Sequence, residues 1–409
     1  HPWVRGTVVV APHAYVQVTP ADGTFRLEQV PPGRYTLSAT SDGFRPYRNS
    51  AVVVRFEDKL RIDLRLELGP ASNSIDVSAA APLLQTATGE VAFHLDQRPI
   101  ETLPLDGRNF IPLVTLSPGV ALPNGQFLPR INGSRPRTSE YIYDGISMLQ
   151  PEPGQVAYYP IVDGMSEFRL NVNAYSPEYG RSNGGTILVI GKSGTNQLHA
   201  SAFEFFRNEA LNARNFFAQP GPKPEFRRNQ YGATIGGPIQ RDKTFFFADW
   251  QGTRLRTGIT RFSVVPTLAQ RNGNFTQSIF DPLSNPRTPF PASTIPTSRL
   301  DPLGLLVLQR YPTPNFVGAN NFVRTATEPD DQDQADLRVD RYIGDKHRIF
   351  ARYTYLRDDD RPVTPLPDGS GSLTSGVIGH ALTRADALVG NYNLVLSPTA
   401  LNQFRIGYS

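Results

Sequence analysis

The chain has 409 residues, of which 39% are hydrophobic and 10% aromatic, with no cysteine and a formal net charge of +4. This length allows two to four domains, and the lack of cysteine excludes disulfides, a thiol nucleophile and a cysteine-ligated metal. The charge is too diffuse for the clustered basic face of a nucleic-acid-binding protein. No run approaches the roughly 20 apolar residues of a membrane helix, whereas the alternating strands of a membrane β-barrel remain compatible with this composition.

Residues 1–68 are predicted to form a small β-sandwich. Turn residues separate short segments in which apolar and polar residues alternate, as they do in half-buried strands. The predicted strands are Gly6–Val10, Ala14–Thr19, Gly23–Val30, Gly33–Thr40 and Leu60–Leu68. The order DGTFRLEQVPPGRYTLSATSDGF resembles the carboxypeptidase-regulatory-like domain, which implies a transthyretin-like fold for this region.

Residues 69–73 read as a linker, and residues 74–198 mix short strands with helical turns. The segment Pro99–Val120 predicts a short helix that ends before Pro118. One side of this helix would carry Ile111, Leu113, Val114 and Leu116. Further along, a Gly-punctuated stretch runs into the apolar strand Thr186–Ile190 and then into a tight turn, GKSGTN.

From His199 onward the pattern changes to strands of about ten residues, the length that a transmembrane β-strand needs. Seven candidates follow one another: HASAFEFFR, YGATIGGPIQ, TFFFADWQG, ADLRVDRYI, HRIFARYTYL, ALVGNYNLVL and LNQFRIGY. Alternation is clear in the fifth, where Ile349, Tyr353 and Tyr355 lie opposite Arg348 and Arg352.

The connections between these strands alternate between long and short. Links 207–226, 253–333 and 357–380 are long, whereas 240–243, 344–346 and 397–399 are tight. Bacterial outer-membrane barrels have short periplasmic turns and long external loops. We therefore expect Asp242, Asp345 and Ser397 on the periplasmic side, and Asn212, Asn274 and Asp368 outside.

Segment 163–217 closely resembles the junction between plug and barrel in TonB-dependent outer-membrane transporters, especially the large Oar-like subgroup. The motifs LDGRNF, LSPGV, INGSRPR, YIYDGI, VDGMSEF and YSPEYGRSNGG follow in family order. The resemblance implies a mainly β protein: the sandwich, an α/β plug over 74–198, and over 199–409 the first seven strands of an antiparallel barrel. Such barrels close at about 22 strands, so the chain, which begins at His1 rather than Met, is expected to be incomplete.

The resemblance also implies a function. It points to a protein of the bacterial outer membrane, whose barrel contacts outer-membrane lipid. The N-terminal domain and the plug would lie on the periplasmic side. Its activity would be active uptake of a large or scarce solute, such as a siderophore, an oligosaccharide or a peptide. Energy would come from TonB with ExbB–ExbD, and neither a cofactor nor a catalytic residue is expected. The alternative is a surface adhesin or glycan-binding protein without transport, using the sandwich and the 253–333 loop.

Two sets of residues are candidates for this function. Ile75, Asp76, Val77, Ser78 and Ala79 follow a linker, where the family carries a TonB box that pairs with TonB by strand addition; an ordinary first plug strand is the other interpretation. The second set consists of charged residues in the plug motifs. Polar contacts that break under force suit a plug; the alternative is that these residues only keep the protein soluble. The gating candidates are Arg108, Arg135, Arg137, Glu167, Glu178 and Arg181.

Motifs for other chemistries lack their required context. Gly180–Gly184 matches G-x-S-x-G, but the strand follows the serine instead of preceding it. Gly191-Lys192-Ser193 lacks the earlier glycine of a phosphate-binding loop. Asp331 and Asp333 lack the next ligand and the glycine of a calcium loop, and no histidine pair has zinc-site spacing.

Overall fold

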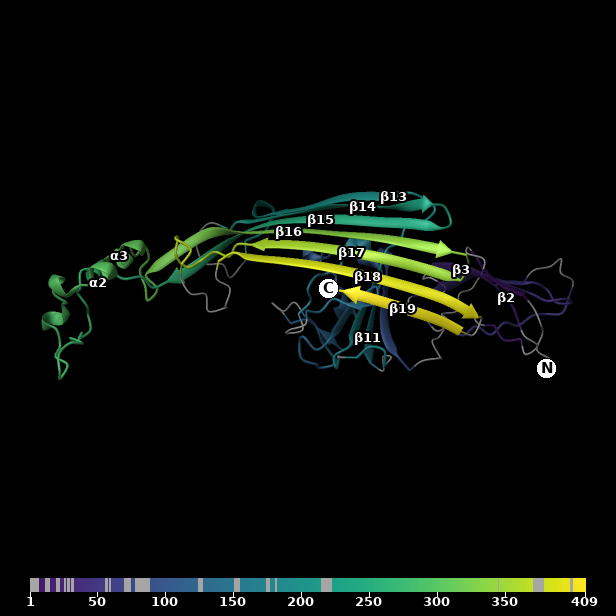
Figure 1. The fold of residues 1–409 in the computed structure, drawn as a ribbon, viewed down its shortest axis with the longest axis horizontal. Helices are drawn as coiled ribbons and strands as arrows, with labels where there is room; N and C mark the ends of the chain where they lie inside the picture. The colour runs from purple at the N-terminus through teal and green to yellow at the C-terminus, as the bar shows by residue number, and fades with distance from the viewer. Residues whose placement is uncertain are drawn as a thin grey trace.

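The computed structural model describes most of the chain. The described residues are 7–11, 15–19, 23–25, 27, 30, 33–55, 58, 60–69, 75–77, 89–123, 128–150, 155–173, 177–180, 182–214, 223–344, 346–370, 379–397 and 400–409. They form two five-stranded sheets, one seven-stranded sheet and a small two-stranded one, so the predicted mainly β fold is confirmed (Figure 1). None of the described helices is long and apolar enough to cross a membrane.

The N-terminal sheet has the order β2-β1-β3-β4-β5. Its strands are β1 (Thr7–Ala11), β2 (Tyr15–Val18), β3 (Gly33–Thr40), β4 (Tyr47–Val54) and β5 (Ile75–Val77). The first three lie where the sequence predicts strands. Residues of β1, β3 and β4, including Val8, Tyr35, Leu37 and Val52, form a separate hydrophobic core.

In the other two segments expected to be strands, the described residues are not assigned to strands. Between Gly23 and Val30 the described residues have irregular backbone structure, although Phe25, Leu27 and Val30 pack against the core. Leu60–Leu68 keeps its predicted alternation, with Ile62, Leu64 and Leu66 half-buried, but it forms only one isolated bridge, between Leu68 and Phe44. Apolar periodicity here reflects packing of an extended segment, without the hydrogen-bonded ladder of a strand.

A middle domain, defined here as residues 89–191, is built on the sheet β10-β9-β12-β11-β6. Its larger strands are β6 (Val91–Asp96), β9 (Glu140–Tyr143), β11 (Met165–Asn173) and β12 (Thr186–Gly191). The shorter ones are β7 (Val120–Ala121), β8 (Arg130–Ile131) and β10 (Ile146–Ser147). Strand β12 runs parallel to β9 and antiparallel to β11, and its residues Ile187, Leu188 and Val189 are buried as a central strand requires.

Short helices cover this sheet: α1 (Gln97–Thr102) and the 3-10 helices η1 (Asp106–Arg108), η2 (Ile111–Leu116) and η3 (Val162–Gly164). The predicted helix before Pro118 is therefore two helical segments, α1 and η2, separated by an extended stretch and η1. Ile111, Leu113 and Val114 are buried as expected, but Leu116 is exposed. The prediction for Leu116 was wrong: it is the last residue of η2, and the chain turns into an extended conformation at Ser117.

The seven-stranded sheet follows chain order with every neighbour antiparallel. Its strands are β13 (His199–Asn208), β14 (Phe226–Gln240), β15 (Thr244–Ser263), β16 (Phe322–Ile343), β17 (His347–Asp360), β18 (Ala381–Ser397) and β19 (Ala400–Tyr408). All seven predicted strands are present. All of them are longer than predicted, β13 and β19 by a single residue. Thr253–Ser263 and Phe322–Asp333, expected in a loop, pair as the ends of β15 and β16.

Tight turns gather at one end of this sheet, the end at which the N-terminal domain lies (Figure 1). The opposite end carries the longer connections, including η4 (Glu209–Leu211). The connection between β15 and β16 holds α2 (Leu268–Arg271), η5 (Pro291–Ser293), η6 (Thr297–Arg299) and α3 (Pro302–Arg310). Asp345, one of the predicted turn residues, lies outside the described residues.

The two faces of the seven-stranded sheet differ in chemistry. One face carries polar side chains such as Asp249, Asp336 and Arg352, all buried. On the opposite face, Leu337, Tyr353, Leu388 and Tyr408 are paired in register across four strands, and all are exposed. This pattern of an apolar outer face and a polar inner face is the one that a transmembrane barrel requires.

Charged residues lie at both ends of this apolar face. Asp333, Arg357 and Arg384 pair in register toward the long connections, and Arg341 lies toward the tight turns. From Asp333 to Arg341 along β16 is about 26 Å at 3.3 Å per residue. With a strand tilt of roughly 35–45°, this corresponds to a height of about 19–22 Å, somewhat below the apolar band of roughly 25 Å in outer-membrane barrels.

Candidate plug–barrel contact

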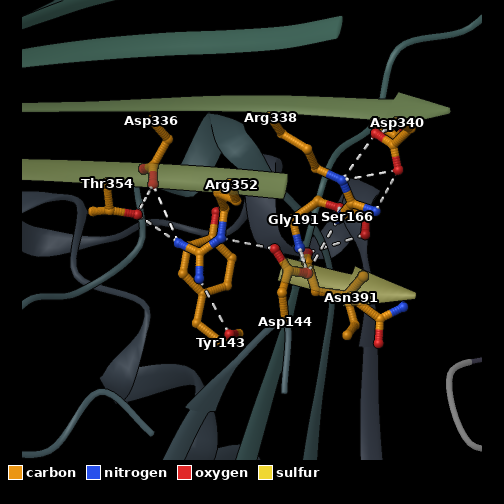
Figure 2. Close-up of polar contacts among 12 residues, drawn as sticks. Tyr143, Asp144, Ser166, Gly191, Asp336, Arg338, Asp340, Arg352, Thr354 and Asn391 are labelled. Carbon is orange, nitrogen blue, oxygen red and sulfur yellow. Dashed lines mark hydrogen bonds and ion pairs between the residues drawn. The ribbon is translucent and has the colours of Figure 1, made fainter. Parts of the chain in front are cut away.

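A buried polar cluster joins the middle domain to the inner face of the seven-stranded sheet (Figure 2). Its centre is Asp144, in the turn after β9, whose side chain is 2% exposed. One carboxylate oxygen accepts hydrogen bonds from the Gly191 backbone N–H at 3.0 Å and from Arg338 at 3.2 Å. The other lies 2.9 Å from Nε of Arg352. Two arginines of β16 and β17 thus hold one carboxylate of the middle domain.

Each arginine is fixed by further contacts. Arg352 donates to the carbonyl oxygen of Tyr143 at 3.1 Å, lies 3.4 Å from the centre of the Tyr143 ring, and pairs with Asp336. Burial raises the pKa of Tyr143 well above its ordinary value, so this phenol stays neutral beneath the guanidinium. Arg338 donates to Asp340 and lies over the ring of Phe350, 4.2 Å from its centre.

A second contact forms where η1 of the middle domain meets β13 and β14. Arg108 pairs with Asp163 and lies over Phe203 and Phe205, 4.3 and 4.6 Å from the ring centres. Burial lowers the pKa of Arg108, while Asp163 opposes that shift. Beside it, the Gly107 carbonyl oxygen accepts a hydrogen bond from Gln230 at 3.0 Å.

The neighbouring Asp106 reaches the same two strands. Its carboxylate pairs with Arg228 and, at 3.1 Å, with Arg207. The hydrogen bond from Arg228 is the main reason why the pKa of Asp106 is lowered. The ion pairs of Asp106 are more exposed than the Asp144 cluster, so water and salt screen them more strongly.

The gating candidates from the sequence fall in different places. Arg108 reaches the seven-stranded sheet, where it lies over Phe203 and Phe205. Glu167 is buried inside the middle domain, 3.3 Å from His94 of the neighbouring strand. Arg135, Arg137 and Glu178 are exposed, and Arg181 lies outside the described residues.

Sequence reasoning missed the Asp144 cluster. Asp144 lies within the quoted motif YIYDGI, and Arg352 was placed on the polar face of its strand, so both had a signal. The sequence does not show that Asp144 pairs with Arg338 and Arg352, because about half of the chain separates them from it. Only the docked middle domain brings them together.

The other candidates fall as follows. Ile75–Val77 forms β5, while Ser78 and Ala79 lie outside the described residues. Asp331 and Asp333, weighed as calcium ligands, are in β16 and pair with Arg256 and Arg254. Ser182, of the G-x-S-x-G match, donates to the Gly185 carbonyl oxygen in a turn. Among the described residues, no group of three His, Cys, Asp or Glu side chains could hold a metal.

Comparison with known proteins identifies the class. The family described as "Outer membrane beta barrel domain" matches residues 190–409, which is more than half of the chain, and the carboxypeptidase regulatory-like domain matches residues 2–67. The chain therefore belongs to the outer membrane β-barrel family and is a protein of the bacterial outer membrane.

Particular relatives narrow this further. The chain is homologous to the TonB-dependent transporter Oar of Myxococcus xanthus, with 30% identity over 258 residues, or 60% of this chain and 24% of that protein. It thus spans about a quarter of the length of that relative. The crystal structure of the outer membrane transporter YddB from Escherichia coli matches with a TM-score of 0.50 and 16% identity, covering 77% of this chain and 38% of that one. At that identity the match shows the fold. Both are described as transporters rather than enzymes.

Proposed function

We propose that this protein is a TonB-dependent transporter, in which the middle domain is a plug that closes the lumen of a β-barrel. The observation that carries the proposal is the cluster in which Arg338 and Arg352 hold Asp144. Ion pairs and hydrogen bonds act over short distances, so a displacement of a few ångströms breaks them. The strands of the sheet, in contrast, are joined by continuous backbone ladders, so a pull would move the plug before it opens the barrel.

The proposal extends to the arrangement of the whole protein. Residues 1–68 and the plug, over 74–198, would lie on the periplasmic side, joined by the linker 69–73, with residues 199–409 giving the first barrel strands. The transported solute would be large or scarce, of the siderophore, oligosaccharide or peptide kind. TonB, driven by ExbB–ExbD, would supply the force. The name of the Myxococcus relative supports the dependence on TonB.

The segment that begins with β5 is the proposed TonB box. A strand that pairs with TonB needs its backbone N–H groups, and proline removes one. Val77→Pro should therefore weaken binding of the purified periplasmic domain of TonB to the detergent-solubilised full-length protein, whereas Val77→Thr, which keeps the N–H, should not. Equal binding by the proline variant would return the segment to ordinary structure.

The rival function, a surface adhesin or glycan-binding protein, rests on one observation. The long connection between β15 and β16 is folded, and its helix α3 exposes Leu303, Leu306 and Val307. Such a protein would bind ligands at the surface and would have no affinity for TonB. The same titration with wild-type protein therefore separates the two functions.

A further inference from the structure

Strand β5 belongs to the N-terminal sheet. It pairs in parallel with β4, with Ile75 opposite Tyr47, Asp76 opposite Arg48 and Val77 opposite Asn49. Beyond Asn49 the register of β4 shifts, and the Asn49 side chain accepts a hydrogen bond from the Ala51 N–H at 3.0 Å. Among the described residues, the pairing of β4 with β5 covers the first three residues of β4.

Among the described strands, β5 has a partner along one edge and none along the other. β5 is the last strand in the order β2-β1-β3-β4-β5, and no strand among the described residues pairs with its other edge. Successive residues of a strand direct their backbone N–H and C=O groups to opposite edges. An edge strand held in this way is a ready template for a strand of another chain.

Resting on the proposed function, we propose that β5 stays in the N-terminal sheet when TonB binds, and that a TonB strand adds to its open edge. The N-terminal domain would then be part of the docking surface rather than a cover over the box. Pairing with β4 already fixes the backbone of β5 in the extended form, so the binding step has less conformational entropy to lose. The alternative, release of β5 before binding, would break the β4 pairing first.

This docking is compatible with force transmission. Among the described residues, the N-terminal core draws on residues between Val8 and Leu66 and the core of the middle domain on residues from Phe93 onward, so the two cores share no residue. The N-terminal sheet precedes β5 in the chain, and the middle domain follows it. A pull on β5 therefore reaches the middle domain along the backbone, whether or not β5 is paired with β4.

Two variants of the full-length protein test the proposal in opposite directions. Arg48→Cys with Asp76→Cys places cysteines at paired positions, where adjacent strands lie within disulfide reach, and this chain has no other cysteine. The oxidised variant locks β5 to β4. The second variant deletes residues 1–69 and keeps β5. The probe for both is the purified periplasmic domain of TonB, titrated by biolayer interferometry, with unheated gel mobility confirming a folded barrel.

We expect the locked variant to bind TonB within about twofold of its reduced form, and the deletion to weaken binding by roughly fivefold or more, because the preorganised edge is lost. Arg55→Gln is the matched control: it removes the exposed ion pair with Asp96 between the two domains but leaves the β4–β5 pairing intact, so its affinity should be unchanged.

Several outcomes would overturn the proposal. Binding that is lost on oxidation and restored by reductant would show that β5 must leave the sheet, as would a deletion variant that binds more tightly. Failure of the disulfide to form would show that β5 is not paired with β4. In each of these cases wild-type protein still binds, whereas wild-type protein that does not bind TonB at all would refute the proposed coupling itself.

Discussion

At the scale of single residues, Asp144 shows how a local turn prepares a distant contact. Its φ is 50°, and Gly145 follows at 88°, so the chain reverses through left-handed conformations immediately after β9. Aspartate tolerates this region better than most residues, and glycine enters it freely. The turn presents the carboxylate both to the Gly191 N–H and to the arginines of the seven-stranded sheet.

Replacing this carboxylate should loosen the middle domain. Asp144→Asn leaves Arg338 and Arg352 buried with less compensating charge, and breaking such a pair costs about 3–5 kcal/mol. The urea concentration at which full-length protein in a planar lipid bilayer begins to conduct should therefore fall. Asp331→Asn is the control, because its pair with Arg256 is about a third exposed and should contribute about 1 kcal/mol or less. Similar midpoints for the two variants would contradict the assignment.

At the scale of elements, the link between β12 and β13 passes very close to the seven-stranded sheet. A Cβ atom on Gly194 would lie 2.3 Å from the Phe246 carbonyl oxygen and 2.6 Å from that of Gly237. Both are backbone atoms of paired strands, which cannot rotate away. Only glycine fits where the chain leaves the middle domain and enters the barrel.

Gly194→Ala should therefore reduce the yield of folded protein. We expect a loss of about 1–3 kcal/mol, the usual cost of overpacking. The fraction of full-length protein in the outer membrane that migrates as a folded barrel on unheated gels measures this. Gly180→Ala is the matched control, since its Cβ would meet nothing within 4 Å. A normal yield for Gly194→Ala would mean that this link runs elsewhere.

The strands of the seven-stranded sheet were predictable because the alternation of polar and apolar residues that defines them is visible within each short segment. An inner polar and an outer apolar face impose a period of two, and Arg352 and Tyr353 fall on the faces that the sequence assigned. Strand ends were not predictable, because beyond the apolar band β15 and β16 become polar and resemble loops, and cross-strand pairs such as Arg254 with Asp333 hold them. The contacts between the middle domain and the seven-stranded sheet depend on docking, so the sequence around a charged motif residue such as Arg135 gave no information on its partner.

At the scale of the whole molecule, the tight turns and the long connections define two ends of the sheet, and the sequence predicts which end faces the periplasm. Single cysteines in full-length protein test this. An impermeant thiol reagent applied to intact cells should label Asn212→Cys, Asn274→Cys and Asp368→Cys. Asp242→Cys and Ser397→Cys should be labelled only after the outer membrane is opened. Labelling of residue 242 in intact cells would reverse the orientation and contradict the strand assignment.

The central claim is that the middle domain closes a pore formed by the barrel. The most direct measurement compares, in planar lipid bilayers, the conductance of the intact full-length protein with that of a variant lacking residues 89–190. Gel mobility would confirm that both barrels are folded. We expect the intact protein to be closed and the variant to conduct as a wide, steadily open channel. An intact protein that conducts on its own, or a folded variant that stays closed, would contradict the account.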